Sequence, residues 1–172
     1  MDRANGVAFL LSGVFFACIS CENNAQKTAE PIAAPESPQV DRQTHKAEFS
    51  LPGDGVVSEV VAGALVLAEQ DKRQLIVYVG ASWCEPCEYF AGALKSSSLP
   101  KELDNWRFLK FDHDKDEARL DESGYGGQMI PRFVIPRQDG RGSERRFEGG
   151  IKGPEAVGYL TTRLRALVET TD

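Results

Sequence analysis

A short apolar run, Leu75–Val79, leads almost directly into two cysteines, Cys84 and Cys87. The run reads LIVYV; it is continuously apolar and rich in β-forming residues, which is the pattern of a strand buried on both faces. Pro86 lies between the cysteines, where its missing N–H suits the first turn of a helix. The segment therefore predicts a buried strand that ends just before a helix, with both cysteines at the junction.

The rest of the domain alternates between helical and strand patterns. Helices are expected where apolar residues recur at helical spacing, and strands where short apolar or β-rich runs are bounded by turn residues. The expected elements in chain order are a helix at about 55–70, a strand at Leu75–Val79, a helix at 85–97, a strand at Trp106–Asp112, a short helix at 115–123, a hairpin of Arg132–Ile135 and Glu144–Phe147, and a last helix opened by Pro154. This order predicts an α/β domain whose central mixed β-sheet is flanked by helices on both faces.

Composition limits what the cysteines can do. The chain has four cysteines and two histidines, and Cys18 and Cys21 fall in the apolar N-terminal segment. A structural zinc site needs four ligands, usually from two cysteine pairs or from one pair with histidines. His45 and His113 each stand alone in polar sequence and are expected to be solvated, so we expect no metal site. The net charge of −6 and the lack of a basic patch argue against a nucleic-acid partner.

The position of Cys84 favours redox chemistry over a structural disulfide. A helix N-terminus carries partial positive charge and unpaired N–H groups, both of which favour the thiolate. Cys84, at an exposed tip, is expected to attack, and Cys87, one turn inward and more buried, to resolve the mixed disulfide. A disulfide that closes so short a ring constrains little chain and adds little stability. We therefore expect a dithiol–disulfide cycle in which the Cys84–Cys87 disulfide is the redox group and no cofactor is needed.

The first 21 residues are expected to carry the chain out of the cytoplasm. Arg3 precedes a largely apolar run that ends at Cys21, the pattern of a secretory signal; the run is marginal as a membrane span, which needs roughly 20 apolar residues. It resembles a bacterial lipoprotein signal in which Cys21, after the small Ser20, is lipidated, and Cys18 is a second candidate. An uncleaved anchor and an ordinary cleaved signal are the alternatives. All three predict an extracytoplasmic, periplasm-facing domain.

The chain is expected to have three parts. Residues 1–21 form the targeting segment. Residues 22–50 are rich in Ala, Pro, Glu and Gln and show no apolar periodicity, which is typical of a disordered tether. Residues 51–172 are enough for one domain with its own core.

Two motifs, WCEPC at residues 83–87 and MIP at residues 129–131, resemble the active-site motifs of thioredoxin-like thiol–disulfide oxidoreductases. The resemblance covers about residues 55–170 and implies the thioredoxin-like fold.

The resemblance also assigns roles around the cysteines. It implies that Pro131 is a cis-proline facing the disulfide and that Ile130 offers its backbone to an extended substrate peptide as an added strand. Gly149 matches a family glycine that lets a partner approach closely, and Trp83 matches the tryptophan that shields the site.

The sequence departs from the family at a buried carboxylate. The family's aspartate below the disulfide falls on Tyr78, so another group or water must take the proton of the inner cysteine. Lys110 matches the lysine that accompanies that aspartate and here lacks its partner. Glu85 and Glu88 are candidate substitutes, although both fit solvated surface charges better. Glu85 also places a negative charge between the thiols, which disfavours the thiolate and tilts the couple toward a reductant.

The motif CEPC is similar to that of anchored, extracytoplasmic reductases that serve cytochrome c maturation. We therefore expect a membrane-anchored protein-disulfide reductase that acts on disulfide-containing exported proteins. No nucleotide or flavin motif is present, so an upstream protein thiol donor is expected to supply electrons. An isomerase remains open, and Glu85 disfavours a strong oxidase. The alternative function is a thioredoxin-fold binding, adaptor or redox-sensing module without turnover.

Overall fold

A computed structural model of the chain describes residues 46–169. The expected targeting segment, with Cys18 and Cys21, and most of the expected tether, with His45, lie outside the described residues. Within residues 46–169, no helix combines the length and the apolar character needed to cross a bilayer.

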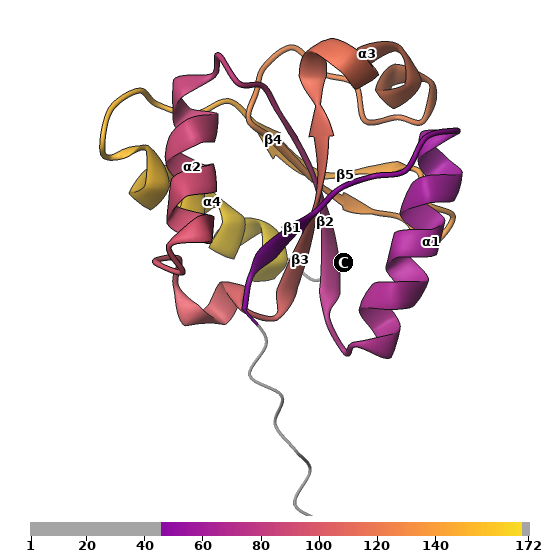
Figure 1. The fold of residues 1–172 in the computed structure, drawn as a ribbon, viewed down its shortest axis with the longest axis horizontal. Coiled ribbons are helices and arrows are strands. Elements are labelled where there is room, and N and C mark those ends of the chain that lie inside the picture. Colours follow the sequence, from indigo (N-terminus) through magenta and orange to yellow (C-terminus); the bar gives the residue numbers. More distant parts are fainter. Residues whose placement is uncertain (1–45, 170–172) are drawn as a thin grey trace, which may run out of the picture. The chain divides into compact units, whose positions relative to one another are not determined.

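Five strands form one mixed sheet in the order β1-β3-β2-β4-β5 (Figure 1). The strands are β1 (Glu48–Ser50), β2 (Gln74–Gly80), β3 (Trp106–Asp112), β4 (Arg132–Pro136) and β5 (Gly142–Glu148). β2 is the central strand; of the two edge strands, β1 is short and β5 is rich in charged residues. β1, β3 and β2 run parallel, while β4 is antiparallel to β2 and to β5. The predicted mixed sheet, including the β4–β5 hairpin, is confirmed.

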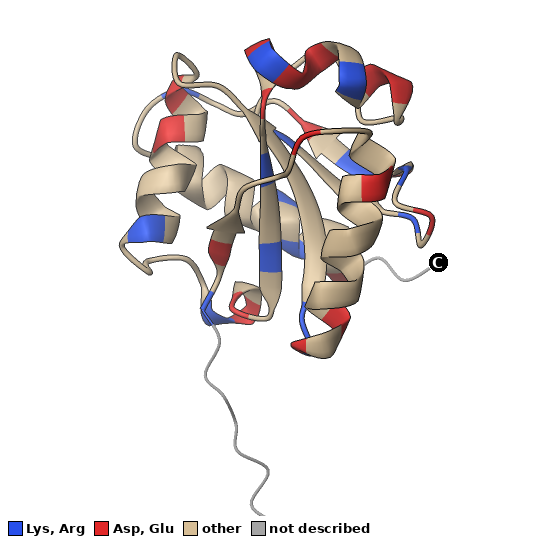
Figure 2. Cartoon of the chain, turned by 45° about the vertical axis from the view of Figure 1, so that its right-hand side comes forward, with Lys and Arg blue, Asp and Glu red and all other residues tan. Residues whose placement is uncertain are grey.

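Helices cover both faces of this sheet, as predicted (Figure 1). One face is covered by α1 (Val57–Gln70) and α3 (His113–Glu122), and the other by α2 (Glu85–Lys95) and α4 (Ala156–Glu169). A 3-10 turn, η1 (Lys101–Leu103), follows α2. Charged residues of both signs gather on α3 (Figure 2), whose buried residue is Leu120.

The apolar run of β2 is explained by a core on each side of it. Ile76 and Tyr78 belong to the core under α2 and α4, whereas Val77 and Val79 belong to the core under α1 and α3. Successive side chains of a strand point to opposite faces, so a strand buried on both sides must be apolar throughout. β2 therefore holds its C-terminal end, and the cysteines that follow, at the middle of the sheet.

The folded domain begins before residue 51, so the predicted tether boundary is wrong by a few residues. β1 lies in the stretch assigned to the tether and pairs parallel with β3, Phe49 opposite Phe108. A three-residue strand is too short to show a periodic pattern, and its partner lies far along the chain.

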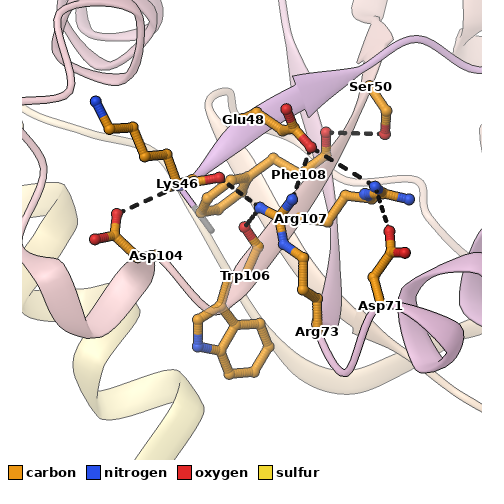
Figure 3. A network of polar contacts seen from close by, with 10 residues as sticks. Lys46, Glu48, Ser50, Asp71, Arg73, Asp104, Trp106, Arg107 and Phe108 are labelled. Carbon is orange, nitrogen blue, oxygen red and sulfur yellow. Dashed lines mark hydrogen bonds and ion pairs between the residues drawn. The ribbon is translucent and has the colours of Figure 1, made fainter. Parts of the chain in front are cut away.

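Polar contacts rather than a long apolar run hold β1 in place (Figure 3). Arg73 is buried and donates through Nη1 to Glu48 Oε1 at 2.7 Å. Its Nη2 donates to the carbonyls of Lys46 and Trp106, at 2.7 and 2.8 Å. Arg107 places Nη2 3.6 Å from the same Glu48 oxygen. The chain thus enters the domain where β2 and β3 begin, at the opposite end of the sheet from the cysteines.

The remaining helices differ from the prediction mainly at their ends. α2 ends at Lys95 rather than 97, and α4 begins at Ala156, two residues after Pro154. α3 starts at His113, two residues early, because the Asp112 carboxylate accepts the N–H groups of Asp114 and Lys115 at 3.1 and 3.2 Å. Such a side-chain cap satisfies backbone donors that a helix start leaves unpaired.

Candidate active site

Cys84 and Cys87 lie at the junction of β2 and α2, as predicted. Cys84 is the N-cap residue of α2, and Pro86 lies in the first turn. The two sulfurs form a disulfide of 2.01 Å, with the Cα atoms 5.2 Å apart. This Cα separation lies within the usual range for a disulfide. One turn of helix therefore brings the pair together at the end of the central strand.

Cys84 is less exposed than predicted. Its exposed fraction is 5%, against 3% for Cys87, so both members of the oxidised pair are buried. The pair belongs to the core under α2, and Ile130, from a distant part of the chain, packs against that core. Greater exposure therefore gives no reason to expect Cys84 to be the attacking thiol, and that prediction rests on its place at the helix N-cap.

Trp83 stands outside the core beside the disulfide, with 65% of its surface exposed. Its Nε1–H donates to Asp114 Oδ2 at 2.8 Å, and its ring lies edge-on to that of His113 at 6.3 Å. Both partners come from the first turn of α3. The indole is therefore held at the start of α3 by a hydrogen bond, and it is not a core residue.

The predicted proline segment faces the same region. The Ile130–Pro131 peptide bond is cis, as expected. The Gly149 N–H donates to the Pro131 carbonyl at 2.9 Å, so these two predicted site residues are in contact. Gly149 has φ +80°, a backbone conformation that glycine adopts readily, and a Cβ there would lie 3.3 Å from Met129 Cε.

A hollow of about 270 Å³ lies between these groups. Three of its lining residues are predicted site residues: Trp83, Ile130 and Gly149. The other four were not predicted as site residues: His113, Gln128, Met129 and Gly150. His113 was expected to be solvated, but it is half-buried, and its buried Nδ1 has no hydrogen-bond partner among the described residues. The sequence did contain a signal for His113, which directly follows the predicted strand Trp106–Asp112. The C-terminal ends of parallel strands lie at the same edge of a sheet, so His113 could have been placed near the cysteines that follow β2.

Tyr78 fills the position of the family's carboxylate with an aromatic ring. It is buried in ring contacts with Phe90 and Phe133, at centroid distances of 5.7 and 5.1 Å. A Cβ at Gly80 would collide with its hydroxyl, so the glycine gives the phenol room. Burial raises the pKa of Tyr78 well above its ordinary value. The phenol therefore keeps its proton at neutral pH and cannot act as the base.

Lys110 lies opposite Tyr78 on β3, as the motif match implies. Its Nζ is 5.2 Å from the centroid of the Phe49 ring, a cation–π contact. The lysine thus packs on β1, the strand that the sequence did not predict.

Glu85 and Glu88 are both exposed in the first turn of α2. Glu85 Oε1 accepts the N–H of Gly153 at 3.0 Å, which ties the start of α2 to the loop before α4. Within residues 46–169, no three His, Cys, Asp or Glu side chains are grouped so that they could hold a metal ion.

Known proteins are similar to this chain over the region that contains the cysteine pair. A protein-family model described as "Thioredoxin-like" matches residues 58–136, which include Cys84, Cys87 and Pro131. Thioredoxin H1 of Arabidopsis thaliana is 34% identical over 71 residues, which are 41% of this chain and 59% of that protein. The match thus spans less than two thirds of this relative's length.

Solved structures are similar at lower identity. Fasciola hepatica thioredoxin is 24% identical, with 66% of this chain and 92% of that chain covered and a TM-score of 0.44. A poplar thioredoxin h is 23% identical, with 72% and 98% covered and a TM-score of 0.45. The family match spans both motifs, and the cysteine pair lies at the β2–α2 junction. The chain therefore has a thioredoxin-like fold and is a thioredoxin-like redox protein with the pair Cys84–Cys87.

Proposed function

We propose that this protein is a protein-disulfide reductase of the cell envelope. The observation that supports it best is the placement of Cys84 at the N-cap of α2, with Cys87 one turn further and Ile130 packed against their core. A helix N-terminus stabilises a thiolate, which is the attacking species in disulfide exchange.

The proposed reaction exchanges one disulfide for another. The Cys84 thiolate attacks one sulfur of a client disulfide, and the other client sulfur leaves as a thiolate and takes up a proton. The Cys87 thiolate then attacks Cys84 Sγ, and the client's second sulfur leaves and is protonated. The client gains two electrons and two protons, and the enzyme dithiol becomes the Cys84–Cys87 disulfide. An upstream protein dithiol would return the enzyme to its reduced form.

The client would bind along the segment from Met129 to Pro131. An extended peptide can pair with the backbone of Ile130 as an added strand. The hollow between Trp83 and Gly149 offers room for a client side chain. Because Tyr78 keeps its proton, deprotonation of Cys87 would depend on water or on another group.

The reduction potential is the sharpest test of the direction of this reaction. The Glu85 carboxylate, in the first turn of α2, opposes the helix dipole and so disfavours the reduced, thiolate form. We expect a wild-type potential nearer about −270 mV than about −120 mV, and a rise of about 10–30 mV in Glu85→Gln. The substitution removes the charge but keeps an oxygen that can accept the Gly153 N–H. Glu59→Gln, in the first turn of α1, is the matched control and should change nothing.

The measurement is equilibration of the purified domain with glutathione or dithiothreitol buffers of known potential. A wild-type value above about −180 mV would overturn the reductase assignment and leave an oxidase or isomerase.

A second candidate is a binding or sensing module without turnover, which the loss of the buried carboxylate at Tyr78 favours. Reduction of insulin separates the two. With dithiothreitol as electron source, a reductase should make reduced insulin precipitate faster than dithiothreitol does alone. A module without turnover should not change the rate of precipitation.

We also propose that Cys21 carries lipid and anchors the domain to a membrane. The support is the apolar run that ends at Ser20-Cys21. Mass spectrometry of the mature N-terminus should find a diacylated cysteine, which Cys21→Ala should abolish and Cys18→Ala should not affect. An intact Met1, or an unmodified N-terminus further along the chain, would contradict this proposal.

A further inference from the structure

We propose that an ion pair outside the cysteine motif, Arg132–Glu148, positions the Met129–Pro131 segment and thereby sets how tightly the protein holds a client disulfide. The inference rests on the proposed reductase function. It adds two positioning residues to the site, neither of which belongs to the WCEPC or MIP motif.

The pair joins the two strands that border the proline segment. Arg132 directly follows Pro131 at the start of β4, and Glu148 directly precedes Gly149 at the end of β5; the two are cross-strand neighbours. Arg132 Nε lies 3.4 Å from Glu148 Oε2, and only 2% of the arginine side chain is exposed. The ion pair is therefore adjacent in sequence to both Pro131 and Gly149, which are joined by the hydrogen bond from the Gly149 N–H to the Pro131 carbonyl.

The same carboxylate oxygen also holds the backbone of the segment. Glu148 Oε2 accepts the Met129 N–H at 2.8 Å. On the other side, Arg132 Nη1 donates to the Tyr125 carbonyl at 2.8 Å. Between these two anchors, a Cβ at Gly127 would lie 2.6 Å from Glu148 Oε2, closer than real side chains come. The chain from Tyr125 to Met129 is thus wrapped directly on the ion pair.

The charges make this arrangement dependent on both partners. Burial alone would raise the pKa of Glu148, but the Met129 N–H and the positive charge of Arg132 outweigh it and hold that pKa below its ordinary value. Glu148 is therefore ionised at neutral pH. Arg132 Nη2 is buried without a hydrogen-bond partner in the described part of the chain, so the guanidinium depends on its few remaining contacts.

The pair is linked to the client-binding segment and not to the sulfurs. Met129 and Ile130 line the hollow beside Trp83, and Met129 is the residue whose N–H Glu148 fixes. Removing the carboxylate would free that N–H and let the Ile130 backbone turn away from the orientation that a client strand needs. Within residues 46–169, the hydrogen bonds and the ion pair of Arg132 and Glu148 do not involve Cys84 or Cys87. Client affinity should change while the chemistry of the thiols does not.

The test compares Glu148→Ala, Glu148→Gln and, as the matched control, Glu144→Gln at an exposed position of the same strand. With insulin as client, Glu148→Ala should raise KM about tenfold with kcat within about twofold, the effect of one lost charge-assisted hydrogen bond. Glu148→Gln keeps a neutral acceptor and should fall between Glu148→Ala and the wild type. Glu144→Gln should behave as the wild type does, and the reduction potential should be the same in all four proteins.

A double variant guards against loss of folding. Arg132→Met with Glu148→Ala removes the unpaired buried charge that the single variant leaves, so the melting temperature should recover while KM stays high. If KM recovers together with the melting temperature, the pair acts only on stability and the inference fails.

Amide hydrogen exchange gives a readout that does not need turnover. Exchange of the Met129 N–H should accelerate in Glu148→Ala and not in Glu144→Gln. Unchanged exchange, or an unchanged KM, overturns the inference. A wild-type protein that reduces no insulin defeats the proposed function instead, and it leaves the positioning of Met129 to be decided by the exchange rates.

Discussion

Replacing Cys84 by serine should abolish disulfide exchange, with a loss of activity of more than about 10³-fold. A serine hydroxyl at the N-cap of α2 still suits a helix start but cannot form a disulfide with the client. Cys87→Ser should instead accumulate the intermediate, since Cys84 can still attack and no second thiol can release the client. Each variant replaces one sulfur by oxygen, and the two positions lie within the first turn of α2. The variants are therefore matched controls for each other.

Non-reducing gels and mass spectrometry of proteins captured from cells would measure this difference. Cys87→Ser should carry clients bound through Cys84, and Cys84→Ser should carry almost none. Because the two cysteines are almost equally buried in the disulfide, at 5% and 3% exposed, exposure alone gives no reason for such an asymmetry. Equal trapping by both variants would show that the N-cap position does not select the attacking thiol.

The strands that place the site could be predicted because their own residues specify burial. Leu75–Val79 is apolar at every position, and Trp106–Asp112 was predicted with the bounds that the structure has. The cysteines and Pro131 could be placed because each belongs to a motif whose spacing is local or follows the chain order of the family. In these cases the signal and the structure lie in the same short segment.

β1 and the exposure of Cys84 could not be predicted, since both depend on distant partners. Glu48–Ser50 becomes a strand by pairing with β3 and through the buried guanidinium of Arg73. Cys84 is buried within a core to which Ile130 contributes, 46 positions along the chain from it.

The Arg132–Glu148 pair shows how register limits prediction. The hairpin was predicted, but its register was not, and a slip of one residue on β5 would place Phe147 opposite Arg132. The observed ladder also contains an irregularity between Val134 and Pro136, which no simple count from the turn would include. The sequence therefore did not indicate that Arg132, beside the proline motif, would pair with Glu148.

Phe90→Ala should destabilise the domain by about 3–5 kcal/mol and lower its melting temperature by about 10–20 °C. Phe90 is fully buried on α2, one turn after Cys87. Its ring meets a ring from each of the three inner strands, at centroid distances of 5.7 Å to Tyr78, 5.5 Å to Phe108 and 5.1 Å to Phe133. Truncation removes these contacts together and leaves a cavity under the helix that carries the site.

Thermal and urea unfolding of the oxidised domain would measure this loss, with two comparison variants. Phe90→Leu fills most of the space and should cost clearly less than Phe90→Ala. Tyr89→Ala removes the neighbouring ring, which is 40% exposed, and should cost about 1 kcal/mol or less. Similar losses for Phe90→Ala and Tyr89→Ala would mean that helix propensity or general surface burial, and not the aromatic cluster, fixes α2 on the sheet. A loss confined to Phe90 would identify the Phe90 ring as the contact that holds the Cys87 turn against the central strands.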